Sequence, residues 1–489
     1  MSASQAFAAR APYRGSGAAL RGHPLLRVSN LSAALSVVLV LLQLRGGTVG
    51  EVAALLAVPV SAAAVFAADR RYLPTVLLLA LPSLGTLSGR DAHGLVSTAT
   101  APFVFPEATT FVALAGVELT APLAILAAAF ARVVLELLRG GRVFRGVLPW
   151  WLLPLFLVSF LPVLAGGLQG QALGYNRWSQ GPRAMLAVAG FLWGIVVVRR
   201  AGPEGVARLT RQLTAVVSLA ALLLMVRFLH GMMVFLAVGF IGGVLPGLVA
   251  RRRFLEAGLC ALSVAVAALS MTLTTFAEVV LAIGCVVLAA PGFRAAGRML
   301  VRAGVFAACV MSGLLIWAVM QMQGKTALEM VTRDEGLMAY AVFKLMGDRG
   351  PLWLAAVEQI TGGPYLVVPA GRPLRPQSFD YGGLVYTWEF GAHNTVLELV
   401  RNVGVVGGVA ALVLMGFAIT AAVRLLLSTP SSALRGLAAG FLGVAIVGIT
   451  TGNFPVYDVG FFLWAVGGML AGARLYATRE ALETAGGAA

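Results

Sequence analysis

Charged residues are scarce in this chain. Only 11% of its residues are Asp, Glu, Lys or Arg, against about 25% in an ordinary soluble domain. The acidic ones are fewest, with 20 Asp and Glu against 36 Lys and Arg. A chain of 489 residues with a mean hydropathy of +0.90 has too little polar surface to be soluble. The shortage of charge therefore predicts an integral membrane protein.

Cysteine and histidine are also rare. The three cysteines, Cys260, Cys285 and Cys309, all fall inside apolar runs, and no pair has the spacing of metal ligands. We interpret them as reduced core residues. No cluster of histidines and carboxylates has metal-ligand spacing, and no Gly-rich phosphate loop follows a strand. We expect no metal and no cofactor.

The apolar residues occur in continuous runs, each near the ~20 residues that a helix needs to cross a bilayer. Continuous rather than alternating runs favour helices over a barrel. The fold class predicted is an all-α integral membrane protein with about 12–14 transmembrane helices. The spans are expected near 31–44, 51–68, 72–89, 109–131, 147–166, 184–198, 213–229, 231–249, 254–270, 275–291, 303–321, 395–423, 436–450 and 458–473.

The arginines alternate with these spans. With the N-terminus in the cytoplasm, most of the 36 basic residues fall on the cytoplasmic side, including Arg132, Arg251 to Arg253, Arg424 and Arg435. This is the positive-inside rule, and it accounts for the net charge of +16 without nucleic acid as a partner. The first apolar run lacks a clear cleavage site after it, so we expect an uncleaved first span.

The chain is expected to divide into five parts. These are a cytoplasmic tail (1–30), eleven spans (31–321), a large periplasmic loop that is partly helical (322–394), three further spans (395–473) and a second cytoplasmic tail (474–489).

The loop contains one clear helical pattern. Residues 350–361 predict a short helix with Trp353, Val357 and Ile360 on one face. Gly and Pro residues from 362 onwards, including Gly382 and Gly383, mark irregular structure. A long irregular loop in a compact protein is usually functional or disordered, and the aromatic content of this one favours an ordered loop.

His393 stands at the outer end of the span that follows the loop, in the sequence GAHNTVLELVRNVGVVGG, and Asn394 follows it. A histidine at the mouth of a helix beside an ordered loop can act as a general base. The alternative, an interfacial histidine that only caps the helix, carries about equal weight from position alone.

Arginines are the candidates for binding an anion. Arg349 precedes the predicted loop helix, and its guanidinium can grip a phosphate through two bonds or simply pair with Asp348. Arg227 lies in an outer turn between two apolar runs, where snorkelling to lipid headgroups is the alternative. Arg372 and Arg375 add positive charge to the loop.

Three other residues are weaker candidates. Glu278 lies within a span, where acids are often functional but can also pair with an arginine. Tyr386 and Trp388 are suited to stacking on sugar rings, although a membrane-interface belt is the commoner role of such aromatics.

The string His393-Asn394-x-x-Leu397 with Gly404 and Gly407 after it resembles the C-terminal signature of the O-antigen ligase and polymerase superfamily. The preceding pattern, Arg349-x-x-x-Trp353 and then Gly-Gly-Pro, is similar to the outer loop of that family. The resemblance is specific over 345–408 and only architectural elsewhere.

The resemblance implies a membrane glycosyltransferase of the bacterial inner membrane whose active site faces the periplasm. Its donor would be a glycan on undecaprenyl pyrophosphate, and its acceptor another glycan or the lipid A core; members need no metal. His393 would be the catalytic base and Arg349 would contact the pyrophosphate, with Arg227 as a second arginine. Trp353 and Asn394 would support them. A base opposite the leaving group predicts inversion at the anomeric carbon.

One departure from the family concerns the Ser-Arg pair that often opens a span before the loop. Here the matching place reads Thr274-Thr275-Phe276-Ala277-Glu278, without an arginine. The alternatives are a flippase or transporter for a lipid-linked sugar, and a channel. We see no related halves of the kind transporters often show and no charged ring or filter motif, and the polar residues gather at the outer face. These features favour an enzyme, with ligase and polymerase both open.

Overall fold

The computed structural model describes eleven stretches and some single positions of the chain. They are 112–114, 117–119, 121–139, 188–199, 242–269, 273–289, 350–362, 377–381, 384–388, 394–448 and 463–475, together with Ala392, Phe144 and scattered positions within 38–67 and 201–210.

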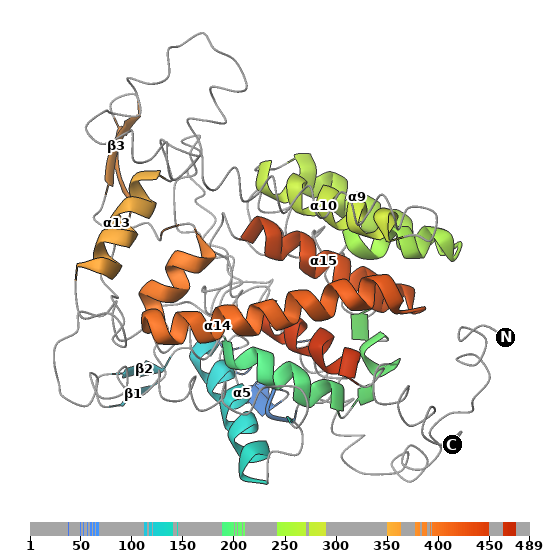
Figure 1. Ribbon diagram of the computed structural model, residues 1–489, viewed down its shortest axis with the longest axis horizontal. Helices are drawn as coiled ribbons and strands as arrows, with labels where there is room; N and C mark the ends of the chain where they lie inside the picture. The colour runs from blue at the N-terminus through green and yellow to red at the C-terminus, as the bar shows by residue number, and fades with distance from the viewer. Residues whose placement is uncertain are drawn as a thin grey trace.

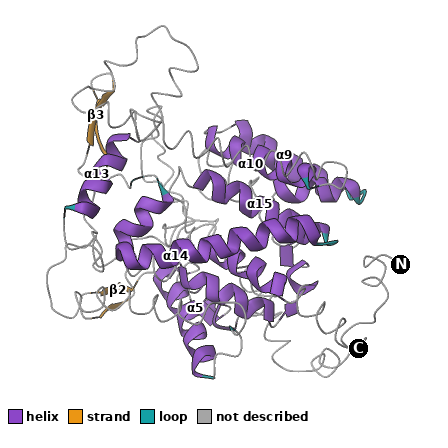
Figure 2. Ribbon diagram, viewed as in Figure 1, coloured by secondary structure: helices purple, strands orange, loops and turns teal. Residues whose placement is uncertain are grey.

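Helices dominate these stretches, as the sequence predicts, and two short β-hairpins are the exceptions (Figure 2). The labelled helices are α5 (Ala121–Leu138), α9 (Phe254–Leu269), α10 (Leu273–Leu288), α13 (Gly350–Thr361), α14 (Thr395–Ser428) and α15 (Ser432–Gly448). Further helices cover Val188–Arg199, 242–250 and Leu463–Leu475.

Helices α14 and α15 form an antiparallel hairpin through the middle of the molecule (Figure 1). The turn between them contains Pro430, and the residue before it, Thr429, is extended with φ −77° and ψ 136°, as the proline ring requires. The side chain of Ser431 accepts from the backbone N–H of Leu434 at 3.4 Å and so caps α15. Arg435 Nη2 donates to the carbonyl of Thr429 at 2.8 Å and closes the turn.

Glycines bring α15 into backbone contact with its neighbours. A Cβ added at Gly436 would lie 2.8 Å from Cα of Val244, so helix 242–250 crosses α15 closely. A Cβ at Gly443 would lie 2.7 Å from the carbonyl oxygen of Glu278 in α10. Small residues at such crossings are the usual way in which apolar helices approach each other when lipid supplies no hydrophobic driving force.

A second pair, helices Val188–Arg199 and Leu463–Leu475, packs in the same way. A Cβ at Gly194 would lie 2.9 Å from the backbone nitrogen of Met469. Trp193 and Trp464 are among the largest fully buried side chains of the described part, and they belong to one continuous apolar core with residues of α14 and α15.

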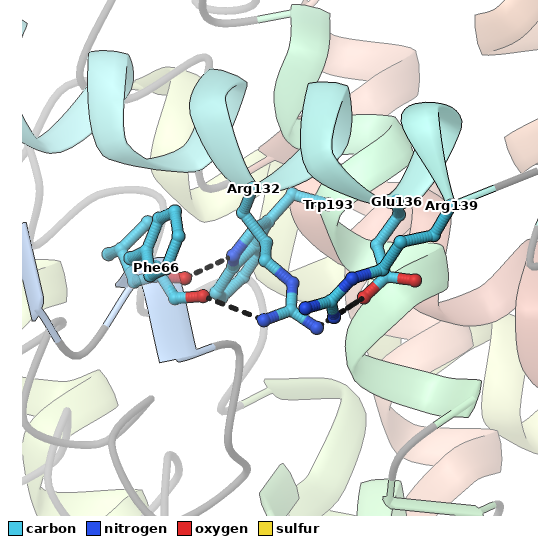
Figure 3. Close-up of polar contacts among 6 residues, drawn as sticks. Phe66, Arg132, Glu136, Arg139 and Trp193 are labelled. Atoms are coloured by element: carbon cyan, nitrogen blue, oxygen red, sulfur yellow. Dashed lines mark hydrogen bonds and ion pairs between the residues drawn. The ribbon is translucent and has the colours of Figure 1, made fainter. Parts of the chain in front are cut away.

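Arg132 of α5 forms a buried polar cluster (Figure 3). It pairs with Glu136 one turn along the helix, and its Nη1 donates to the carbonyl of Phe66 at 3.4 Å. Nearby, Trp193 Nε1 donates to the carbonyl of Val65 at 2.7 Å. Arg132 is 4% exposed. It is therefore an internal brace between helices, while its predicted position on the cytoplasmic side stays a prediction.

Among the described residues, one helical stretch, Val403–Ser428, is long and apolar enough to cross a membrane. At about 1.5 Å per residue, its 26 residues exceed the ~30 Å of a hydrocarbon core. The helices Val188–Arg199, Glu278–Leu288, Ser432–Gly448 and Leu463–Leu475 are apolar but shorter.

The expected span 109–131 is divided in the structure. Strands β1 (Val112–Leu114) and β2 (Val117–Leu119) pair antiparallel, and α5 starts at Ala121. Pro122 explains the break, because proline is tolerated in the first turn of a helix but cannot continue one from upstream.

A second hairpin lies where we expected irregular structure. Strand β3 (Gln377–Tyr381) pairs antiparallel with β4 (Leu384–Trp388), and Tyr381 lies opposite Leu384. The chain between these two partners is Gly382-Gly383, which is a strong signal for a two-residue hairpin connection. The two glycines therefore indicate a hairpin here.

Candidate functional site

The site is built where α13 packs against the first turns of α14 (Figure 1). Ala356 of α13 and Ala392 are both fully buried and form one apolar cluster with Trp353 and Leu397. The predicted helix 350–361 is confirmed as α13. Ala356 of this helix is fully buried, whereas Val357, one of the three residues of the predicted face with Trp353 and Ile360, has an exposed side chain. This cluster fixes the loop helix to the segment that precedes α14.

Asn394 is the N-cap of α14. Its side-chain oxygen accepts from the backbone N–H groups of Val396 at 3.0 Å and Leu397 at 3.2 Å. Asn394 is extended, with φ −144° and ψ 118°, as an N-cap residue usually is. Because Asn394 supplies the cap, capping does not account for the histidine at 393.

Glu398, in the first turn of α14, binds the residue that precedes position 393. Its Oε1 accepts a hydrogen bond from the backbone N–H of Ala392. Arg401 Nη2 donates to both carboxylate oxygens of Glu398, at 2.9 Å and 2.8 Å. Glu398 and Arg401 are both buried, so the carboxylate is shielded from solvent and compensated by one guanidinium.

Helix α14 changes direction at Gly404, which has φ 78° and ψ 168°. This backbone conformation is essentially restricted to glycine. After the bend the helix passes close to its own start, because a Cβ at Gly408 would lie 2.8 Å from Cα of Val400. The predicted span 395–423 is thus a short segment that carries Glu398 and Arg401, followed by the long apolar helix (Figure 1).

Several of the arginines predicted to be cytoplasmic lie at the opposite end of α14 from this site. Helix 242–250 leads into Arg251, Arg252 and Arg253, and a Cβ at its Gly247 would lie 3.1 Å from Cβ of Ser432, the first residue of α15. Arg435 belongs to the same end through its bond to the α14–α15 turn. Thr395 bonds to Gly448 at the last residue of α15 and Ser432 is its first residue, so this basic end and the segment around Asn394 are separated by about the length of α15, roughly 25 Å.

Glu278 lies in α10 near the site end of α15. It is 1% exposed, and among the described residues neither of its carboxylate oxygens has a hydrogen-bond partner. Its backbone approaches Gly443, five residues before Gly448, whose carbonyl accepts from Thr395. The structure thus brings Glu278 to the same half of the bundle as Asn394.

Of the other predicted site residues, the structure describes only Tyr386 and Trp388 among those in the loop. His393, Arg349, Arg227, Arg372 and Arg375 lie outside the described residues. Arg349 directly precedes α13. In β4, Tyr386 lies opposite Phe379 and Trp388 lies opposite Gln377.

Three residues of the site were missed by sequence reasoning. Thr395, Glu398 and Arg401 are all buried and all make polar contacts at the start of α14. The spacing Glu398-x-x-Arg401 on an otherwise apolar helix was a usable signal, because two charges three residues apart lie on the same helix face.

Within the described part of the chain, no three His, Cys, Asp or Glu side chains gather closely enough to hold a metal ion. Comparison of the whole chain with models of known families, with curated proteins and with solved structures found no match.

Proposed function

We propose that this protein is a multi-pass membrane glycosyltransferase that moves a glycan from undecaprenyl pyrophosphate to an acceptor hydroxyl at the periplasmic face of a bacterial inner membrane. The observation that carries the proposal is the junction of α13 with the start of α14, where Trp353 and Ala356 pack on Ala392. This contact joins the two parts of the sequence in which the family resemblance resides.

The positions of the charges support the proposed orientation. Arg251 to Arg253 and Arg435 gather at one end of the central helices, and the segment around Asn394 lies at the other. If the basic end faces the cytoplasm, as the positive-inside rule requires, the site faces the periplasm. In this orientation the site would bind lipid-linked glycans at the periplasmic surface of the membrane.

The proposed reaction is a single displacement. His393 takes the proton of the acceptor hydroxyl while that oxygen forms a bond to the anomeric carbon of the donor. The bond between this carbon and the pyrophosphate oxygen breaks, and undecaprenyl pyrophosphate leaves with the electron pair. Arg349 and Arg227, with Arg372 and Arg375 in the loop, would neutralise the charge that develops on the leaving group. Product of inverted configuration would agree with this scheme.

The test is transfer by the purified full-length protein from an undecaprenyl-pyrophosphate glycan, with EDTA present. We expect transfer by the wild type and its loss in His393→Ala. His23→Ala, in the N-terminal tail, is the matched control and should transfer normally. No transfer by the wild type to glycan or lipid A core acceptors, together with movement of the lipid-linked glycan across liposome membranes, would instead establish a flippase.

The polysaccharides that accumulate in cells without the active protein distinguish a polymerase from a ligase. Loss of the surface polymer while single repeat units persist would indicate a polymerase, and accumulation of full-length polymer on the lipid carrier would indicate a ligase.

A further inference from the structure

Glu398 joins three parts of the site through one carboxylate. It sits on the first turn of α14, accepts from the backbone N–H of Ala392, six residues earlier, and pairs with Arg401, three residues later. Ala392 is fully buried against α13. Glu398 therefore links the segment before the helix, the helix itself and the packing of the loop helix.

The two covalent neighbours of His393 are held by different groups. Ala392 is held by Glu398, and Asn394 is held by its cap bonds to Val396 and Leu397. Fixing both neighbours of a residue fixes the two points from which its backbone is built, since consecutive Cα atoms are about 3.8 Å apart.

Burying a carboxylate and a guanidinium is unfavourable unless each has a partner, and apolar residues of similar size are often at least as stable. The buried pair is thus poorly explained by stability alone. A backbone N–H that lies in no helix or strand, such as that of Ala392, needs an acceptor, and a carboxylate is a strong one.

We infer that Glu398 is the positioning residue for the base at position 393, with Arg401 holding its carboxylate in the required rotamer. The inference rests on the proposed function. A general base must come within about 2.6–3.2 Å of the proton that it removes. Displacement of a reacting group by about 1 Å can lower a rate by roughly 10²-fold.

Three variants separate the hydrogen bond from the charge. Glu398→Ala removes the acceptor of the Ala392 N–H. Glu398→Gln keeps an oxygen in its place and removes the charge. Glu398→Gln combined with Arg401→Met keeps that oxygen and leaves no unpaired buried charge.

Steady-state transfer is measured for these variants. We expect Glu398→Ala to lower kcat by about 10²-fold with KM for the donor nearly unchanged, because the base is misplaced while the donor still binds. The glutamine variants should stay within about tenfold of the wild type. A wild-type kcat in Glu398→Ala would overturn the inference, and so would equal losses in the alanine and glutamine variants.

Amide exchange gives a readout that does not depend on activity. In the peptide that contains Ala392, Glu398→Ala should exchange at least about tenfold faster than the wild type, and Glu398→Gln should remain close to it. Unchanged exchange in Glu398→Ala would overturn the inference even if transfer falls. A wild type that shows no transfer would defeat the proposed function itself, a result distinct from either of these.

Discussion

The hydroxyl of Thr395 donates a hydrogen bond to the carbonyl oxygen of Gly448 and so ties the first residue of α14 to the last residue of α15. These residues are 53 apart in the chain, and the bond is buried. It closes the helix hairpin at the end opposite the turn at Thr429. The start of α14 is therefore fixed by α15 as well as by α13.

Replacing Thr395 with valine tests this bond, because valine keeps the shape and loses the hydroxyl. The free energy of unfolding should fall by about 1–2 kcal/mol, since the carbonyl of Gly448 loses its buried partner. Thermal unfolding in detergent measures the change. Thr420→Val is the control, because Thr420 makes an exposed bond within its own helix at 2.7 Å. Equal effects of the two changes would contradict a special role for Thr395.

Gly404 is a position in α14 at which the addition of a side chain should be harmful. Gly404→Ala places a Cβ on a backbone with φ 78°, so the free energy of unfolding should fall by about 1–3 kcal/mol and transfer should fall with it. Gly416→Ala in the same helix is the control, because a Cβ there meets nothing within 4 Å. That change should be neutral or stabilise the protein by up to about 1 kcal/mol. The melting temperatures of the two variants, measured in the same detergent, test this difference.

Trp353 is predicted to act through packing. Its indole Nε1 is buried and has no hydrogen-bond partner among the described residues, while its ring belongs to the cluster with Ala392. Trp353→Phe should therefore preserve stability and keep transfer within about twofold, and Trp353→Ala should reduce both, with about 2–3 kcal/mol lost from the half-buried site. A large loss of transfer in a stable Trp353→Phe protein would show that the indole N–H contacts substrate instead.

The buried carboxyl group of Glu278 can be tested by its replacement with glutamine. A carboxylate without a partner is unfavourable in an apolar bundle, so the neutral isostere in Glu278→Gln should leave the yield and the melting temperature unchanged or raised. If Glu278 supports the donor only through its shape and hydrogen bonding, transfer should stay within about threefold of the wild type. A stable variant with no transfer would mean that the acid itself is required. Glu358→Gln, on an exposed residue of α13, is the control.

Hydropathy and helix period predicted the parts of this fold that depend on local sequence. The expected spans 254–270, 275–291 and 436–450 correspond to α9, α10 and α15 with ends that differ by a few residues. The loop helix at 350–361 was predicted to the residue, because a proline at its start and paired glycines after it mark both ends.

The features that the sequence did not reveal depend on the folded backbone around the start of α14. The spacing of Glu398 and Arg401 suggests a pair on one helix face, but only the folded chain shows that the carboxylate also accepts from the backbone N–H of Ala392. The bend at Gly404 likewise depends on backbone angles that hydropathy does not report. The catalytic roles of His393 and Arg349, which the resemblance to glycosyltransferases implies, remain predictions.

Arg349 is predicted to bind the pyrophosphate of the donor. Arg349 directly precedes α13, the helix that packs on the segment around Ala392. If its guanidinium grips the pyrophosphate through two bonds, lysine cannot replace it, because an ammonium group lacks the planar fork. A charge-assisted bond contributes roughly 1.5–3 kcal/mol, so kcat/KM for the donor should fall by about ten- to hundredfold in Arg349→Lys.

The matched control for this change is Arg424→Lys, on an exposed residue near the other end of α14. It should transfer like the wild type, and both variants should unfold at the wild-type temperature. Full activity in Arg349→Lys would exclude a bidentate clamp at this position. Recovery of activity in Arg349→Lys at high donor concentration would indicate that Arg349 binds the ground state, whereas a loss confined to kcat would place its contact in the transition state, where the leaving pyrophosphate gains charge.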